Sequence, residues 1–150
     1  MHRLYEQEDI AIFWDSEKCR HAKRCVTGSP RTFDITRRPW IDPTKAPTAE
    51  IWQAVSACPS GALTCVYTHG IRIVLDEEGH RSIALDGEKQ IGECDFDETE
   101  DCVEIFHTEV LPEYGRKGIA KRLVYKVTEA AEHAKKRVLS SCSYAKKVLE

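Results

Sequence analysis

The sequence predicts an α+β protein in two parts: a small first part built around cysteine loops, then a mixed α/β sheet with one long helix. Two cysteine-bearing stretches, residues 19–25 and 58–63, flank a single short helix pattern. Strand patterns separated by turn signals run from residue 71 to 110. Apolar residues then recur at helical spacing over 119–134.

The composition limits the size and class of the protein. The 150 residues suffice for one large domain or two small ones, and a hydrophobic content of 41% allows a packed core. Small domains bury proportionally less surface, so a bound metal cluster would add stability that the first half needs. The net charge of −3 argues against non-specific nucleic-acid binding, and we expect no nucleic-acid partner.

The chain shows no export signal. Its first residues are polar, no segment approaches the length of a membrane span, and we expect no membrane partner. Seven cysteines without an export signal indicate thiols or metal ligands, not disulfides. We therefore expect a reducing, cytoplasmic setting.

The first half has the elements of a small sheet with one helix. Residues 10–14 and 63–67 are β-like runs that could pair, and residues 32–35 also resemble a strand. A helix is predicted over 47–57, since Pro47 suits a first turn and Pro59 forbids continuation.

The segment Cys58-Pro59-Ser60-Gly61-Ala62-Leu63 is the sharpest signal in this half. A cysteine followed by proline and small residues is how bacterial-type ferredoxin loops supply their last cluster ligand. Proline turns the chain away, and the small residues let the backbone approach an inorganic core.

The first half resembles the mono-cluster ferredoxins, and most closely a divergent family of small iron–sulfur proteins. The resemblance covers residues 10–67 and rests on C-x-H-x3-C from Cys19 to Cys25, the following Pro39-Trp40-Ile41, and the ending that begins at Cys58. It implies an iron–sulfur cluster with Cys19, Cys25 and Cys58 as ligands.

The ligand count leaves the cluster type open. Ferredoxin loops space their ligands as C-x2-C-x2-C, and Ala22 takes the middle position here. Three cysteines suit a [3Fe–4S] cluster, whereas a [4Fe–4S] cluster would be completed by His21 or a small outside ligand. Cys65 reads as a buried strand thiol. A zinc site of the Cys₃His type is the competing structural interpretation, although no tight C-x2–4-C pair occurs.

Basic side chains surround the first cysteine loop at positions 18, 20, 23 and 24. They are either a solvated loop or a positive surface that stabilises an anionic cluster and receives an acidic redox partner.

The second half begins near residues 68–70, which predicts domains 1–68 and 69–150. Its predicted strands are 81–85, 90–96, 102–110 and 138–142, with helices over 119–134 and 143–149. Residues 71–75 are either a further strand or the connection between the two halves. A strand that leads through a glycine-containing loop into a helix is a phosphate site by geometry. Nearby positive charges add to it: Arg116, Lys117, Lys121 and Arg122.

Residues 81–150 resemble the GNAT superfamily of N-acetyltransferases. The resemblance rests on His107-Thr108-Glu109-Val110 before Pro112, on Gly118-Ile119-Ala120, and on Cys142. It implies acetyl-CoA as a cofactor, bound by Val110, Arg116, Lys117, Gly118, Ile119 and Ala120. Two departures matter: Gly115 stands where the superfamily loop carries Arg or Gln, and the early acceptor-site helices of larger members are missing.

Acetyl transfer needs a base for the amine and an acid for the departing thiolate. The alternation of the long strand predicts that His107 and Glu109 share a face with Val103 and Ile105, and either could be the base. Tyr144 is the candidate acid, and Cys142 is placed near the CoA sulfur. Structural roles for all four are the alternative.

Three functions follow. The first is an iron–sulfur protein fused to an acyl-CoA-dependent N-acetyltransferase, responsive to redox state or iron, whose partners are a small-molecule or protein amine acceptor and a redox partner. The second is a non-catalytic electron carrier or CoA-binding protein. The third is a zinc-stabilised structural or interaction protein.

Overall fold

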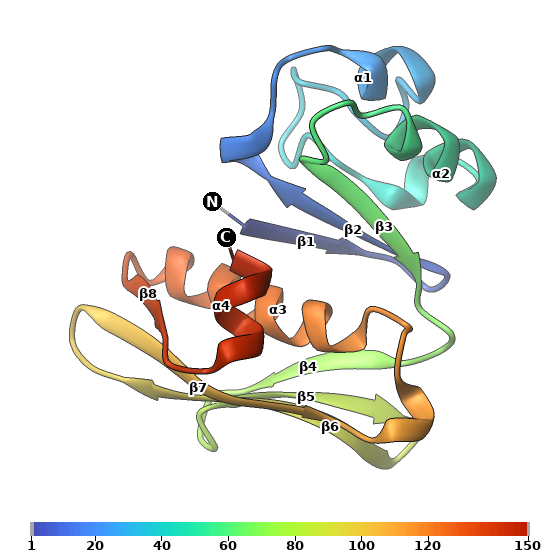
Figure 1. The fold of residues 1–150 in the computed structure, drawn as a ribbon. Helices are drawn as coiled ribbons and strands as arrows, with labels where there is room; N and C mark the ends of the chain where they lie inside the picture. The colour runs from blue at the N-terminus through green and yellow to red at the C-terminus, as the bar shows by residue number, and fades with distance from the viewer. Residues whose placement is uncertain (1, 150) are drawn as a thin grey trace. The chain divides into compact units, whose positions relative to one another are not determined.

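The computed structural model describes residues 2–149, and the chain divides into two compact units, Arg3–Thr68 and the residues from His69 onward. Within each unit, helices cover one face of a β-sheet (Figure 1). This agrees with the predicted α+β class.

The first unit contains a three-stranded sheet in the order β1-β2-β3, made of His2–Glu6, Ile10–Asp15 and Leu63–Tyr67. The predicted pairing of the second and third strands is confirmed: they run antiparallel from Ile10↔Tyr67 to Trp14↔Leu63. Strand β1 was not predicted, because only Leu4 of its five residues is buried and the segment has no apolar alternation.

The helices of the first unit are α1 (Arg24–Gly28) and α2 (Thr48–Ser56), with short 3-10 turns η1 (Ser16–Lys18) and η2 (Pro43–Lys45). The predicted helix at 47–57 is confirmed within one residue at each end.

The predicted strand at 32–35 is wrong, because only an isolated bridge joins Phe33 to Ile41. The chain turns back at once: the Asp34 N–H donates to the Trp40 carbonyl at 2.8 Å, which leaves no length for a ladder. Phe33 and Ile41 are nevertheless fully buried, so their apolar character reflects the core and not a sheet.

The second unit contains a five-stranded sheet in the order β4-β5-β6-β7-β8. Its strands are Arg72–Asp76, Arg81–Asp86, Lys89–Glu98, Cys102–Val110 and Arg137–Ser140. The pairings are antiparallel except for β7 with β8, which is parallel. Helices α3 (Ile119–His133) and α4 (Ser143–Leu149) lie on the same face of the sheet, and η3 (Pro112–Tyr114) precedes α3 (Figure 1).

The predicted strand 138–142 ends earlier than expected, so Cys142 lies outside it. The N–H groups of Ser141 and Cys142 both donate to the Ile105 carbonyl, at 3.0 and 3.2 Å. Because both N–H groups use the same acceptor, the parallel pairing of β8 with β7 ends here and the chain turns towards α4.

Helix α3 packs closely on the sheet. Its Leu123 side chain is fully buried, and the Ser82 hydroxyl donates to the Leu123 carbonyl at 2.8 Å. A Cβ added at Gly92 would lie 3.0 Å from the Glu109 carbonyl oxygen and 3.3 Å from Leu123 Cδ1, so strand β6 needs glycine there. Arg122, which we expected to add positive charge to the phosphate site, is instead 2% exposed and donates to the Ile71 carbonyl at 2.8 Å.

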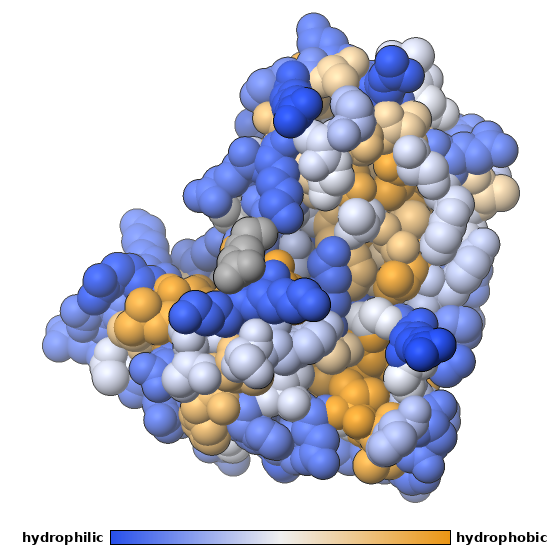
Figure 2. All heavy atoms as spheres, in the orientation of Figure 1, coloured by the Kyte–Doolittle hydropathy of each residue, from blue (hydrophilic) through white to orange (hydrophobic). Residues whose placement is uncertain are grey.

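Hydrophilic residues cover most of the face shown in Figure 2, with smaller hydrophobic patches on both units. Across residues 2–149, none of the helices has the length and apolar character needed to cross a membrane.

Replacing Leu123 by alanine should lower the free energy of unfolding of the second unit by about 2–5 kcal/mol, because the cavity left behind cannot collapse fully. Denaturant unfolding measures the change. The control is Lys126→Ala on the same helix, whose side chain is only half-buried. Equal losses in the two variants would contradict the packing described here.

Candidate functional site

The pairing of β2 with β3 brings the two cysteine-bearing segments to the same end of the first sheet. Strand β2 ends at Asp15 and strand β3 begins at Leu63. The Asp15 N–H donates to the Ala62 carbonyl at 2.8 Å, which joins the start of one segment to the end of the other. The Asp15 side chain also accepts from the Glu17 N–H at 3.1 Å and caps the turn that precedes Cys19.

The helices position the other two cysteines. The Cys58 N–H donates to the Val55 carbonyl at 3.0 Å, which fixes Cys58 at the end of α2. Cys25 lies in α1, and α1 approaches α2 so closely that a Cβ on Gly28 would lie 3.0 Å from the Ala54 Cβ. The docking of these helices therefore sets where Cys25 and Cys58 lie.

Cys19, Cys25 and Cys58 line one pocket together with Ser60 and other residues of both segments. His21 instead lines a larger adjoining hollow, which shares Cys19 and Cys25 with this pocket.

Cys65 is not among the residues that line this pocket or the adjoining hollow. It is half-buried in β3 opposite Ile12, and burial raises the pKa of its thiol to about 11. Both features suit the buried strand thiol that we predicted.

The thiols have different environments. Burial raises the pKa of Cys58, but hydrogen bonds from the Ser60 hydroxyl and from backbone N–H groups of residues 60, 62 and 63 outweigh it, so the pKa is lowered. The pKa of Cys25 is raised, first by burial and further by the nearby Cys58 and Cys19 thiolates. The Cys19 sulfur accepts from the His21 N–H at 3.4 Å. Hydrogen bonds to thiolate sulfur are one of the means by which proteins hold and tune iron–sulfur clusters.

The donor chemistry around this pocket is that of a cluster site. Three cysteine thiols line the pocket, and thiolates are the ligands that iron–sulfur clusters take. Among residues 2–149, no group of three or more His, Cys, Asp and Glu side chains lies close enough to hold a metal ion.

The second unit has an anion-binding geometry at the start of α3. No side chain caps this helix, and the preceding residues Arg116 and Gly118 have φ of 62° and 73°. The Tyr114 hydroxyl donates to Asp86 at 2.5 Å and anchors the loop to the β5–β6 turn. Uncapped N–H groups and two basic side chains, Arg116 and Lys117, suit a phosphate group here.

The second half of β7 has one free edge. Strand β8 pairs with residues 102–105 of β7, whereas the rest of β7 pairs only with β6 in the described part of the chain. The free edge runs to Val110 and leads towards the loop before α3. Its backbone groups are available to an extended chain that carries amides.

A β-bulge interrupts β7 at Phe106. Asp95 of β6 lies opposite His107, and the next residue, Phe96, lies opposite Ile105. Phe106 is thus the extra residue of a bulge, which shifts the alternation of side chains by one position.

The prediction that His107 and Glu109 share a face with Val103 and Ile105 is therefore wrong. Val103 and Ile105 are buried in the core beneath α3. His107 and Glu109 are exposed on the opposite face, where His107 Nε2 lies 3.4 Å from Glu109 Oε2.

Cys142 and Tyr144 lie near each other on the helix side of the sheet. The Thr108 hydroxyl oxygen lies 3.7 Å from the Cys142 sulfur and 3.6 Å from the Cys94 sulfur, and Cys94 is fully buried. Burial, and then the nearby Cys142, raise the pKa of Tyr144. The four candidate catalytic residues therefore form two pairs on opposite faces of β7.

Asp95 was not singled out from the sequence, which showed it only as one of many acidic residues. Burial and the adjacent Glu93 raise the pKa of Asp95 to about 6, while His107 opposes the shift. Asp95 could have been found only from the strand register, because the bulge is what places Asp95 opposite His107.

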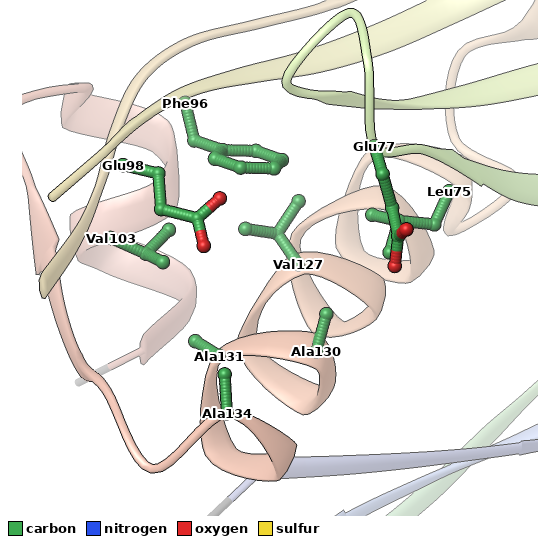
Figure 3. Close-up of a pocket in the computed structure, with 9 residues that line it drawn as sticks. All are labelled: Leu75, Glu77, Phe96, Glu98, Val103, Val127, Ala130, Ala131 and Ala134. Carbon is green, nitrogen blue, oxygen red and sulfur yellow. The ribbon is translucent and has the colours of Figure 1, made fainter. Parts of the chain in front are cut away.

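A separate cavity of about 270 Å³ lies against the C-terminal half of α3 (Figure 3). Its wall contains Val127 and two alanines of that helix together with Ala134, which follows the helix, and the carboxylates of Glu77 and Glu98 lie beside it. It shares no residue with the loop at the start of α3.

Two family models match the chain in succession. Residues 5–68 match a divergent 4Fe-4S mono-cluster family, and residues 81–150 match a GCN5-related N-acetyl-transferase family. The first part of the chain is thus similar to the first family, and the second part is similar to the second family. The resemblances read from the sequence are confirmed, and the families imply an iron–sulfur cluster and acyl-CoA in general terms.

The Uncharacterized protein YjdI of Escherichia coli (strain K12) is 36% identical to this chain over 62 residues. The match covers 41% of this chain and 82% of that relative, and the same values hold for YjdI of Escherichia coli O157:H7.

Solved structures also resemble the chain. The GNAT family protein SP0256 from Streptococcus pneumoniae TIGR4 has a TM-score of 0.37 and 25% identity, over 45% of this chain and 52% of that one. The aminoglycoside acetyltransferase meta-AAC0020 from an uncultured soil metagenomic sample has a TM-score of 0.37 and 22% identity, over 45% and 51%. The chain thus spans about half the length of these proteins, and similarity at this level says nothing of its substrate.

Iodoacetamide should alkylate Cys142 faster than Cys94 between pH 7 and 8.5. Burial raises the pKa of Cys142, but hydrogen bonds from the Ala145 N–H and other backbone groups, together with the contact to the Thr108 hydroxyl, outweigh it and lower the pKa. Burial raises the pKa of Cys94 to about 12. The thiolate is the reactive form, so the lower pKa gives the faster reaction. Peptide mass spectrometry measures both rates, and faster labelling of Cys94 would contradict these environments.

Proposed function

We propose that the first unit holds an iron–sulfur cluster on Cys19, Cys25 and Cys58, and that the second unit is an acetyl-CoA-dependent N-acetyltransferase. One observation supports this most: three cysteines from two separate segments line a single pocket in a chain whose first part matches a cluster family. When bound, the cluster supplies one-electron redox chemistry and makes the protein responsive to redox state and iron supply.

Three thiolates suffice for a [3Fe–4S] cluster, whereas a [4Fe–4S] cluster needs one more ligand. His21, whose backbone N–H donates to the Cys19 sulfur at 3.4 Å, is the candidate for that ligand from this chain. Arg20, Lys23 and Arg24 line the pocket of the thiols. Their positive charge stabilises an anionic cluster and suits an acidic redox partner.

The acetyl-CoA site extends from the free edge of β7 to the start of α3. The N–H groups of residues 118–120 and the Arg116 and Lys117 side chains would hold the pyrophosphate. The β7 edge near Val110 would hydrogen-bond the amides of the pantetheine arm.

Acetyl transfer forms a nitrogen–carbon bond and breaks the carbon–sulfur bond of the thioester. His107 or Glu109, acting through water, would take the proton of the attacking amine, which belongs to a small molecule or a protein. Tyr144, beside Cys142, would hold the proton that the departing thiolate needs.

A second candidate function is electron transfer with CoA binding but no turnover. The separation of the candidate base and acid onto opposite faces of β7 favours it. An assay of acetyl transfer across a panel of small and peptide amines separates the two functions.

Replacing Cys58 by serine should remove most of the iron bound by anaerobically purified protein, since one of three thiolates is lost. The control is Cys65→Ser, which removes a thiol outside the pocket and should leave the iron content unchanged. Iron and acid-labile sulfide are counted per chain. Full iron content in the Cys58 variant would exclude this ligand assignment.

Acetyl-CoA at 100 times its dissociation constant should stabilise the second unit by about 2.7 kcal/mol, seen as a rise in Tm. The double variant Arg116→Gln, Lys117→Gln should lose most of this rise because two charges near the pyrophosphate are gone. The matched control is Lys146→Gln, Lys147→Gln in α4, where both side chains are exposed. An equal rise in both double variants would place the CoA elsewhere.

A further inference from the structure

A hollow of about 550 Å³ adjoins the thiol pocket of the first unit. Its walls are mainly apolar and include Trp14, Trp40, Val26 and Ile35. The two tryptophan rings meet edge to face with their centroids 5.0 Å apart, and Ile35 is 66% exposed. Small-molecule sites commonly have volumes of about 300–1,000 Å³ and aromatic walls, so the hollow has the size and lining of one.

The formally charged side chains that line this hollow, Lys23 and Arg38, are both positive. His21, Lys23 and Arg38 line it, and no Asp or Glu is among its lining residues. Within residues 2–149, no carboxylate lies within ion-pair distance of Lys23 or Arg38. Arg38 donates only to carbonyl groups, those of Ile35 at 3.3 Å and Arg37 at 3.1 Å. Its guanidinium therefore keeps donors for an added anion.

We propose that this hollow binds a small aromatic anion, a carboxylate or sulfonate carried on a flat ring. The ring packs against Trp14 and Trp40, and the anionic group pairs with Arg38 and Lys23. Cys19 and Cys25 border both the hollow and the thiol pocket, so the ligand lies beside the cluster, a part of this proposal that rests on the proposed function. A neutral or cationic ring would bury the same apolar area without the charge pairing.

Calorimetric titration of the anaerobically purified full chain with 2-naphthoate tests the site. We expect saturable binding, and at least tenfold weaker binding of the neutral analogue 2-naphthalenemethanol. Arg38→Gln should weaken naphthoate binding at least tenfold, and Ile35→Glu should abolish it, because Ile35 is exposed and a carboxylate there repels the anion. Lys45→Gln, a basic residue outside the hollow, should leave binding unchanged.

Absence of naphthoate binding to folded protein would overturn the proposal. So would equal binding of the alcohol and the acid, or full affinity in both the Arg38 and Ile35 variants. Circular dichroism confirms that each variant is folded.

Iron and sulfide are counted on the same samples, which separates this proposal from the proposed function. A colourless sample that binds naphthoate supports the hollow and contradicts the cluster. In a brown sample, naphthoate should change the visible or electron paramagnetic resonance spectrum. Binding without any spectral change would overturn the placement beside the cluster.

Discussion

The antiparallel pairing of β2 with β3 is the constraint on which the candidate cluster site depends. Cys19 follows one strand and Cys58 precedes the other, so their pairing alone brings two distant segments to one end of the sheet. The hydrogen bond from Asp15 to Ala62 extends the ladder by one step towards the cysteines. A slip of one residue would move Ile10 and Ile12 out of the core cluster that they form with Phe33, so this packing holds the register that the site needs.

In the second unit, the candidate catalytic and CoA-binding residues lie where the regular pairing of β7 with its neighbouring strands stops. Strand β8 leaves β7 after Ile105, and the bulge at Phe106 follows at once. The departure of β8 leaves a free edge of β7 that leads towards the start of α3. The bulge determines on which face of the sheet each of the following side chains lies. Thr108 then faces Cys142, while His107 faces Asp95. The candidate chemistry thus depends on two irregularities in one strand.

Much of this could be predicted from the sequence, because apolar periodicity and proline positions report directly on strands and helices. Strand β1 could not, since a strand with one buried residue has no apolar alternation. The bulge at Phe106 could not, because an extra residue changes register without changing composition. From the sequence, Arg122 is expected to be a cation on the surface. The structure shows that it is buried and donates to the Ile71 carbonyl. The pairing of residues 10–14 with 63–67 could also be predicted, and it brings Cys19 and Cys58 to one end of the sheet. That Cys25 joins them was expected only through the family resemblance, since sequence spacing does not give distance.

The central claim is that three thiols hold one inorganic group, and X-ray absorption at the iron edge of anaerobically purified protein tests it most directly. The account predicts iron surrounded by sulfur, with other iron atoms as the next neighbours. Iron bound only by oxygen and nitrogen, or colourless protein that contains one zinc ion per chain, would contradict it.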